Sequence, residues 1–320
     1  DYLREFLLDP DVIDAPYLIR QILVRGIILR VRPGKVAPLY EKIWMDEGSP
    51  LRVYSERITE SVSKHVDGIH IEHAMRYGNP SIRKGLENLR EAGVTELLLL
   101  PMFPHHAQAT TETALKHAYK EMKAMSWQPK TIEMGHFPTD ENYINPLAKS
   151  IESHLTEGTH LLYSYHGLPV SHVKRIDASK KHCQKAADCC SVSCSANELC
   201  YGRHCMETSM AVSEKLGLPA DRWSLSFQSR LGPVKWLTPS TTDKVKELVE
   251  RGVRDLAIVA PAFLADGLET LEELDMGIRE EFEEMGGERL TVIKCLNDDP
   301  DWILGLSEMV EGKFRASAPA

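Results

Sequence analysis

Short apolar runs alternate with longer amphipathic segments along most of the chain. The runs are rich in Leu, Ile and Val and predict buried strands, whereas segments with apolar residues every three or four positions predict helices. We expect strands at Gly68–Ala74, Glu96–Leu100, Thr131–Gly135, His160–Tyr165, Trp223–Gln228, Asp255–Ala260 and Leu290–Cys295. We expect helices at 49–65, 79–92, 110–125, 141–155, 205–216, 240–251, 268–285 and 300–312. This alternation predicts parallel sheets covered by helices on both faces.

Two stretches of the chain resemble each other. Residues 93–103 read Gly-Val-Thr-Glu-Leu-Leu-Leu-Leu-Pro-Met-Phe, and residues 252–263 read Gly-Val-Arg-Asp-Leu-Ala-Ile-Val-Ala-Pro-Ala-Phe. Each reads as a helix end, a buried strand, and then Pro and Phe at the end of that strand. The sequence therefore predicts an α/β fold with two similar Rossmann-like domains, each a parallel sheet flanked by helices. We expect the domains at residues 1–140 and 141–299, with a C-terminal helix and tail at 300–320 that packs back on the first domain.

The composition is that of an ordinary globular protein. The 320 residues are 42% hydrophobic and 27% charged, with a formal net charge of −9, and this negative charge argues against a general nucleic-acid binder. No apolar run approaches the ~18 residues of a membrane-spanning helix. Residue 1 begins an amphipathic segment rather than a secretory leader. We therefore expect a cytoplasmic protein.

The stretch Tyr163-Ser-Tyr-His-Gly-Leu-Pro169 ends an apolar run with a histidine, a glycine and a proline. Gly and Pro stop a strand, so we expect the imidazole of His166 at the carboxyl end of a buried strand, where open α/β sheets bind ligands. An imidazole titrates near neutral pH and can accept a proton or bind a metal. The alternative is a hydrogen-bonded histidine of the core.

The stretch Phe263-Leu-Ala-Asp-Gly-Leu-Glu-Thr-Leu-Glu-Glu-Leu-Asp275 follows another predicted strand and opens a helix. Glu269 and Glu273 are four positions apart and therefore share one helix face. Acidic residues near a helix N-terminus are also favoured by the helix dipole, so a solvated acidic face is the alternative. The position of Glu269 at the end of a strand favours a functional carboxylate.

Further motifs accompany these two. They are Asp1-Tyr-Leu-Arg-Glu-Phe-Leu-Leu-Asp-Pro-Asp-Val-Ile-Asp14, Tyr40 to Trp44 with Gly48-Ser-Pro-Leu51, Met75-Arg-Tyr-Gly78, Phe103-Pro-His-His106 with Thr110-Thr111, and Phe227-Gln-Ser-Arg-Leu-Gly-Pro233 with Trp236-Leu-Thr-Pro239. In this order, together with the His166 and Glu269 motifs, they make the chain resemble the ferrochelatases. These class II chelatases insert Fe²⁺ into a porphyrin. The resemblance covers nearly the whole chain.

The resemblance implies a role for individual residues. His166 would face the porphyrin centre, Glu269 would be the carboxylate across the pocket from it, and both would meet the substrate Fe²⁺. The residues that would line or anchor the macrocycle are Tyr40, Ser49, Arg76, Tyr77, Gln228 and Trp236, and residues 18–50 would form a lip of the pocket. Gly267 and Gly277 stand where the family often has a histidine and a further acidic residue, which weakens the expectation of an outer metal-binding row. Family chains begin with a strand ahead of the first helix, so we expect a natural chain to start before Asp1.

The chemistry of metal insertion fits these residue types. Insertion removes two protons from the porphyrin nitrogens, and an imidazole suits proton acceptance. Bending the macrocycle exposes the nitrogen lone pairs to the metal, and binding energy away from the centre can sustain that distortion. We therefore expect His166 to be the proton acceptor and a transient metal ligand, with Glu269 on the metal or proton path. The substrate would be protoporphyrin IX or coproporphyrin III, at a terminal step of haem biosynthesis.

Two alternative functions stay open. One is a chelatase for another tetrapyrrole or metal, such as cobalt insertion into a sirohydrochlorin, and the motif from Gln228 to Trp236 favours a ferrochelatase over it. The other is a non-catalytic iron–sulfur sensor that binds a porphyrin or haem without turnover. Both a monomer and a dimer are compatible with the sequence.

Six of the seven cysteines lie between Cys183 and Cys205, in what resembles an insertion at about residues 178–205. A dense cluster in a chain without a leader favours a metal site over disulfides. Some bacterial ferrochelatases resemble this chain in carrying an internal [2Fe–2S] cluster. That resemblance implies as ligands Cys183, Cys190, Cys200 and Cys205. Cys189 and Cys194 are rival ligands, and structural zinc is the alternative metal.

Residues 18–32 mix apolar side chains with four arginines, at positions 20, 25, 30 and 32. A basic amphipathic segment can lie on an anionic membrane surface. A helix that covers the core with its arginine stems is the alternative. Because a porphyrin is apolar and this segment would be the porphyrin lip, we expect a peripheral membrane contact here.

Overall fold

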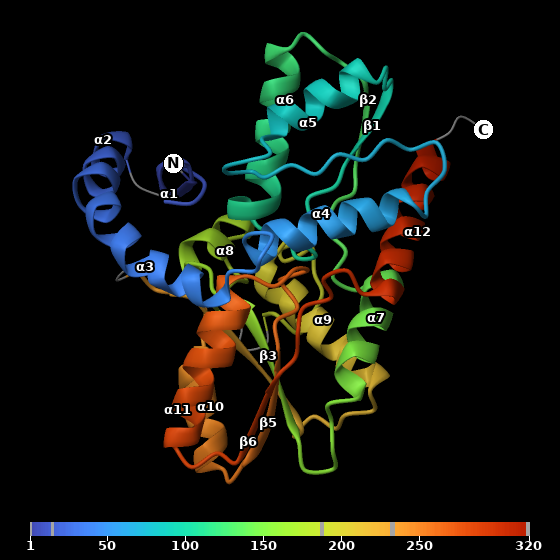
Figure 1. Cartoon of the computed structure of the whole chain (residues 1–320). Coiled ribbons are helices and arrows are strands. Elements are labelled where there is room, and N and C mark those ends of the chain that lie inside the picture. Colours follow the sequence, from blue (N-terminus) through green and yellow to red (C-terminus); the bar gives the residue numbers. More distant parts are fainter. Residues whose placement is uncertain (1, 14–15, 186–188, 231–233, 318–320) are drawn as a thin grey trace. The chain divides into compact units, whose positions relative to one another are not determined.

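The computed structural model describes residues 2–13, 16–185, 189–230 and 234–317. The chain folds into two compact units, drawn in Figure 1. Unit 1 comprises residues 1–102, 108–135 and 307–320, and unit 2 comprises residues 103–107 and 136–306. The short stretch Phe103–Ala107, which follows the strand predicted at Glu96–Leu100, therefore belongs to unit 2.

Unit 1 contains a two-stranded parallel sheet, in which β1 (Glu96–Leu99) pairs with β2 (Lys130–Glu133). Helices α5 (Ile82–Glu91) and α6 (Thr113–Ala124) pack against β1. Their shared apolar cluster consists of Leu86, Leu89, Leu97, Met122 and Met125. The remaining elements of unit 1 are α1 (Tyr2–Leu8), α2 (Tyr17–Gln21), the π-helix η1 (Ile22–Ile28), α3 (Leu29–Ile43), α4 (Pro50–Ser63), the π-helical turn η2 (Gln108–Glu112) and the last part of α12 (Pro300–Ser317).

Unit 2 is built on a four-stranded parallel sheet whose strand order is β4-β3-β5-β6. The strands are β3 (His160–His166), β4 (Trp223–Gln228), β5 (Asp255–Val259) and β6 (Arg289–Val292). The chain runs outward from β3 to β4, and then returns past β3 to β5 and β6. The direction of winding therefore reverses between β3 and β5, and ligands bind at the carboxyl ends of the strands at such a switch point.

Successive residues of β3 point to opposite faces of the sheet. The hydroxyls of Tyr163 and Tyr165 bond to Ser213 and Ser209 of α9 (Tyr201–Lys215), so α9 covers one face. The other face carries Leu162, which joins an apolar cluster supplied by α10 (Thr241–Glu250), the π-helix η3 (Glu269–Ile278) and α11 (Arg279–Glu284). Figure 1 shows these helices beside the sheet of unit 2. Unit 2 also contains α7 (Glu141–Glu152), α8 (Val170–Ile176) and the first part of α12.

Most predicted elements are present, and parallel sheets flanked by helices confirm the predicted α/β class. The strand predicted at Gly68–Ala74 is wrong. Within the described residues this segment joins no sheet, and its Glu72 and Ala74 side chains lie against Gly85 of α5 instead. The helix predicted from residue 205 begins earlier, at Tyr201. The prediction placed the N-terminus too late because the cysteines before residue 205 carry no apolar helix pattern. The helix predicted at 268–285 opens as the π-helix η3.

Candidate active site

His166 is the last residue of β3 and lies opposite Gln228 of β4 in the sheet register. Its Nδ1 atom lies 2.7 Å from the carbonyl oxygen of Gly167. Because a carbonyl oxygen only accepts hydrogen bonds, Nδ1 carries the proton and Nε2 keeps its lone pair. In its neutral form the half-buried imidazole therefore has Nε2 as its unprotonated nitrogen, at the carboxyl end of β3.

The peptide bond between His166 and Gly167 is held on both sides. The Tyr201 hydroxyl donates to the His166 carbonyl at 2.8 Å, and the Gly167 N–H donates to the Gln228 carbonyl at 2.7 Å. A Cβ atom at position 167 would lie 2.7 Å from the Gln228 carbonyl oxygen, closer than real Cβ contacts allow. Glycine is therefore required here by the close approach of β4 to the end of β3.

Glu269 and Glu273 lie on the first turns of η3, which follows β5. The Glu273 carboxylate accepts hydrogen bonds from both the backbone N–H and the hydroxyl of Ser229, the former at 2.8 Å. Burial raises the pKa of Glu273 above its usual value, as does the charge of Glu269, whereas the Ser229 donors and His166 oppose that rise. Glu273 thus interacts electrostatically with both predicted catalytic residues, which places all three at one edge of the unit 2 sheet.

Gln228 is buried in this edge, with 3% of its surface exposed. Its amide oxygen accepts from Ser164 at 2.7 Å, and its amide nitrogen donates to the Glu269 carbonyl at 2.8 Å. Both ends of the side chain are therefore used to fix η3 to β3. Trp236 is half-buried. If position 167 carried a Cβ atom, the Trp236 ring would lie 3.3 Å from it, so the indole lies beside the peptide that joins His166 to Gly167. Residues 231–233 of the same motif lie outside the described residues.

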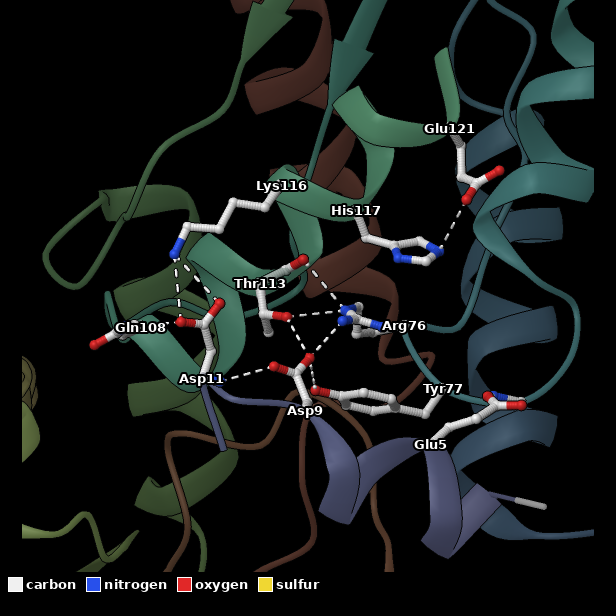
Figure 2. Close-up of polar contacts among 11 residues, drawn as sticks. Glu5, Asp9, Asp11, Arg76, Tyr77, Gln108, Thr113, Lys116, His117 and Glu121 are labelled. Atoms are coloured by element: carbon white, nitrogen blue, oxygen red, sulfur yellow. Dashed lines mark hydrogen bonds and ion pairs between the residues drawn. The ribbon is translucent and has the colours of Figure 1, made fainter. Parts of the chain in front are cut away.

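In unit 1, Arg76 and Tyr77 belong to a hydrogen-bonded network around the carboxylate of Asp9 (Figure 2). The Arg76 guanidinium pairs with Asp9 and also donates to the Thr113 hydroxyl at 3.0 Å, which in turn donates to Asp9 at 2.8 Å. Tyr77 donates to Asp9 at 2.9 Å, and the guanidinium lies 4.4 Å from the centre of its ring. Burial by itself would raise the pKa of Asp9, but the Asp11 N–H, the two hydroxyl donors and the guanidinium together lower it.

A second layer of contacts attaches the same N-terminal segment to unit 1 (Figure 2). Asp11 accepts from Gln108 at 2.7 Å and pairs with Lys116 at 3.2 Å. Glu5 accepts from the Gly78 backbone N–H at 3.0 Å. The network therefore fixes α1 and the turn after it to the segment that carries Arg76 and Tyr77.

The other two predicted macrocycle residues of unit 1 lie on either side of the turn between α3 and α4. Tyr40 is on α3, edge-on to Trp44, and these aromatic rings line a shallow, mostly apolar surface groove with Ala37 and Glu41. Ser49 is the residue before α4, and its hydroxyl forms no capping hydrogen bond there.

The cysteine-rich segment, residues 177–200, connects α8 to α9. The Asp177 carboxylate accepts from the Cys183 backbone N–H at 2.8 Å. The sulfur atoms of Cys189 and Cys190 lie 3.9 Å apart. A hydrogen bond between the thiols of Cys190 and Cys200 lowers the pKa of Cys200, and N–H groups at the start of α9 lower it further. This arrangement favours a thiolate at Cys200.

The other thiols have different surroundings. Burial raises the pKa of Cys183 to about 11, with contributions from Cys200 and Cys189. Cys205 is fully buried in α9, where its thiol contacts the Tyr201 hydroxyl. The Cys194 sulfur lies 3.7 Å from His182 Nε2. Within the described part of the chain, no three His, Cys, Asp or Glu side chains are already arranged as a metal site.

Comparison with known proteins agrees with this picture. The sequence model of the family described as ferrochelatase matches residues 1–314. The chain belongs to the ferrochelatase family. A ferrochelatase of Ectopseudomonas mendocina is 41% identical over 97% of this chain and 91% of its own length. A ferrochelatase of Pseudomonas aeruginosa is 42% identical over 96% and 91%. The relation supports a metal-inserting chelatase with a role in haem biosynthesis.

Solved chelatase structures share the fold of this ferrochelatase. SirB from Bacillus subtilis with Fe³⁺ superposes with a TM-score of 0.53 at 13% identity, covering 83% of this chain and 92% of that one. The sirohydrochlorin chelatase SirB from Bacillus subtilis subspecies spizizenii, in complex with cobalt, also gives 0.53, at 11% identity and 83% and 90% coverage. At these identities the likeness concerns the fold alone.

In this chain the structure gathers His166, Glu269, Gln228 and Trp236 at one edge of unit 2, and places Tyr40, Ser49, Arg76 and Tyr77 in unit 1. Sequence reasoning did not assign roles to Glu273, Ser229 and Tyr201, although all three lie at this edge. The i,i+4 spacing of Glu273 from Glu269 could have indicated the first. Ser229 lies in the motif that begins at Phe227, but neither its contact with Glu273 nor the contact of Tyr201 with His166 could be predicted from the sequence, since these contacts join segments far apart in the chain.

Proposed function

We propose that the protein inserts Fe²⁺ into a porphyrin and releases two protons. The observation that carries this proposal is the His166 imidazole, whose Nδ1–H is bonded to Gly167 and whose Nε2 lone pair therefore stays available. Glu269 and Glu273 lie beside the same sheet edge on η3. A base and acidic side chains are thereby combined at the switch point between β3 and β5.

Each residue has a defined task in this proposal. His166 Nε2 takes a proton from a pyrrole N–H, and the nitrogen lone pair so exposed binds Fe²⁺. Glu269 lies on the path of the metal or of the departing protons. Glu273 accepts a hydrogen bond from Ser229, and its carboxylate interacts with the charge of His166. We therefore propose that Glu273 receives the proton from the imidazole. Two such transfers balance the two protons lost by the porphyrin.

The contacts distinguish direct from indirect roles among the predicted macrocycle residues. Trp236 lies beside the His166 peptide, and we propose that its indole contacts the porphyrin macrocycle. Tyr40 lines an apolar groove, and the Ser49 hydroxyl forms no helix cap, so both suit contact with the porphyrin or its carboxylates. Gln228, Arg76 and Tyr77 are bonded within the protein, and we propose that they brace the site.

The first experiment replaces His166 by Ala and measures anaerobic iron insertion into protoporphyrin IX and into coproporphyrin III. We expect a loss of about 100-fold or more, which is typical for removal of a general base. His65→Ala, at an exposed position just after α4, is the matched control and should retain activity. Insertion by His166→Ala at the wild-type rate would refute the assignment. A cobalt and sirohydrochlorin arm tests the other chelatase reaction, and tight porphyrin binding without turnover would indicate a sensor.

We also propose that the cysteine-rich segment holds a [2Fe–2S] cluster. The thiols present suit the binding of such a cluster. Cys183, Cys189, Cys190 and Cys200 interact with one another, and the surroundings of Cys200 favour a thiolate. Cys205 remains a candidate through its interaction with Cys200. A resident cluster would supply a thiolate-bound metal group that orders the segment. Anaerobically purified protein should then show visible charge-transfer bands and acid-labile sulfide. Bound zinc without sulfide would indicate the structural zinc alternative.

A further proposal concerns a peripheral membrane contact of the segment 18–32. Several of its apolar side chains are exposed: Leu18, Ile22 and Ile27 are 72%, 70% and 58% exposed, whereas Val24 is buried. Arg25 and Arg30 are exposed on the same segment, whereas Arg20 is buried and bonds to the Ile13 carbonyl, so Arg20 does not face a membrane. Exposed apolar and basic residues together suit an anionic lipid surface. Within the part of the chain that the structure describes, no helix is long and apolar enough to cross a bilayer.

Co-sedimentation with vesicles that contain anionic lipid tests this contact. Wild-type protein should sediment, and the double variant Arg25→Ala, Arg30→Ala should sediment less, with a difference that high salt removes. Lys64→Ala with Lys84→Ala, two exposed positions elsewhere in unit 1, is the control. Equal sedimentation of all three proteins would show that the segment does not bind the lipid surface through its arginines.

A further inference from the structure

The Tyr201 hydroxyl makes a contact that the reaction itself does not explain. It donates a hydrogen bond of 2.8 Å to the carbonyl oxygen of His166, which lies 35 positions earlier in the chain. Tyr201 is 5% exposed, and its phenolic hydroxyl is a hydrogen-bond donor at neutral pH. A buried tyrosine therefore restrains the backbone carbonyl of the proposed base.

This bond is one of the contacts that set the direction of the imidazole. The Gly167 N–H is fixed to Gln228 at 2.7 Å, and the Gly167 carbonyl accepts from His166 Nδ1 at 2.7 Å. The peptide plane between His166 and Gly167 thus has one restraint on its N–H side and one, from Tyr201, on its carbonyl side. The Gly167 carbonyl that accepts from Nδ1 lies in the next peptide unit, so rotation of this plane would change the backbone torsions on either side of it and with them the position of that carbonyl relative to the imidazole. Loss of the Tyr201 bond would remove the restraint on the carbonyl side.

Tyr201 also belongs to the cysteine-rich end of the chain. It is the first residue of α9, directly after Cys200, and its hydroxyl contacts the Cys205 thiol. The next residue, Gly202, approaches Cys190 so closely that a Cβ atom there would lie 3.2 Å from the sulfur. The ring of His105 packs edge-on against Tyr201, with centroids 6.0 Å apart, and this limits the positions the phenol can take. The start of α9 therefore contacts both the thiols and the His166 peptide.

We propose that Tyr201 is a positioning residue that fixes the His166 imidazole and couples it to the conformation of the cysteine-rich segment. The proposal rests on the proposed function only in naming His166 as the base, because the contacts exist independently of turnover. Tyr201 touches neither substrate nor metal in this scheme. It acts through the backbone carbonyl of His166.

The test measures the His166 imidazole directly. Protein labelled with ¹⁵N-histidine reports the tautomer of each ring by NMR, and His166→Ala identifies the His166 signals. Wild-type protein should show the Nδ1–H tautomer, and Tyr201→Phe should show a mixture of tautomers. Tyr163→Phe is the matched control, since it removes an equally buried hydroxyl of β3 that bonds to Ser213. An unchanged His166 signal in Tyr201→Phe would overturn the proposal whatever the activity.

Kinetics give a second readout. Loss of one hydrogen bond that orients the base should lower kcat about tenfold, leave KM within about twofold, and shift the pH profile of kcat/KM. If Tyr201→Phe does not fold, 3-fluorotyrosine at position 201 keeps a stronger hydroxyl donor and should preserve the wild-type tautomer. Loss of that tautomer with 3-fluorotyrosine would contradict the proposal. Failure of the wild-type protein to insert iron would refute the proposed function, while the NMR result would still decide the role of Tyr201.

The coupling is tested by a double-mutant cycle. Cys190→Ser alters the thiol that lies against Gly202 and Cys200. It should change the His166 signal in the wild-type background and leave it unchanged when Tyr201 is Phe. The same change in both backgrounds would show that the cysteine-rich segment does not act through Tyr201.

Discussion

Gly167 shows how one residue type can decide the geometry of a site. Its backbone lies against the Gln228 carbonyl of β4 and the ring of Trp236, and its own carbonyl fixes the imidazole of His166. Only a residue without a Cβ atom fits this space. The Gly-Leu-Pro sequence after His166 therefore ends the strand and also orients the imidazole.

We predict that Gly167→Ala lowers both activity and stability. The added methyl would meet the Gln228 backbone, and the strand end must shift, at a cost of about 1–3 kcal/mol for overpacking. Iron insertion should fall at least about tenfold because the His166 peptide moves. Urea denaturation and an insertion assay measure the two effects. Gly158→Ala, where an added Cβ atom meets nothing within 4 Å, is the control and should behave like the wild type.

At the scale of elements, the N-terminal helix α1 is joined to the rest of unit 1 by polar contacts around Asp9. The carboxylate is 7% exposed and gathers an arginine, a tyrosine and a threonine from two other segments (Figure 2). A buried carboxylate needs such partners, because a charge without them is costly to remove from water. The Asp9 contacts therefore act together with the buried Leu7 and the edge-on packing of Phe6 against Tyr77 to position α1.

We predict that Asp9→Asn destabilises unit 1 by about 1–3 kcal/mol, since the guanidinium of Arg76 loses its charged partner in a partly buried position. The residues of α1 should become more accessible to limited proteolysis. Denaturant unfolding and mapping of the first cleavage site measure these changes. Glu5→Gln keeps an oxygen acceptor for the Gly78 N–H at an exposed position and should have little effect. Equal behaviour of the two variants would show that the Asp9 network does not hold α1.

At the scale of the whole molecule, several buried histidines make the folded state sensitive to acid. Burial lowers the pKa of His105 to about 3, and that of His160 and of His204 to about 4. His204 is held neutral by its bonds, because Nδ1 accepts from the His106 N–H and Nε2 donates to the Glu198 carbonyl. Protonation must break one of these contacts.

We predict that stability falls as the pH is lowered from about 6.5 toward 4. In the unfolded chain these imidazoles take up protons near pH 6.5, while in the folded protein they stay neutral, so acid favours unfolding. Between pH 7 and pH 5 each of the three imidazoles contributes a loss of about 1.8 kcal/mol, so together they should lower the free energy of unfolding by about 5 kcal/mol. The raised pKa of Glu273 acts in the opposite direction and reduces the loss. Urea titrations at the two pH values measure it, and a pH-independent free energy would contradict the prediction.

His160→Gln provides the matched comparison for this effect. Glutamine keeps a polar group beside Ser224, whose hydroxyl lies 2.9 Å from His160 Nε2, but cannot take up a proton. The variant should therefore lose less stability than the wild type over the same pH interval. A drop as large as that of the wild type would mean that His160 does not contribute.

The sequence by itself determined the class of fold, the family and the identity of the strand that carries His166. These follow from local information, because apolar runs, glycine and proline act on the backbone near them and the motifs keep their order along the chain. The same information failed at Gly68–Ala74, where residues are extended but pack on α5 without joining a sheet. Whether an extended segment becomes a strand depends on the partner available to it.

Only the tertiary structure decided which atoms meet. The guanidinium of Arg76 is bonded to Asp9 and Thr113, and Gln228 braces η3 through the Glu269 carbonyl, and neither set of contacts could be predicted from the sequence. The tautomer of His166 depends on one carbonyl oxygen, and the carbonyl of His166 depends on Tyr201. Hydrogen bonds between residues far apart in sequence require both groups to be placed within about 3 Å, and no local pattern in the chain encodes that distance.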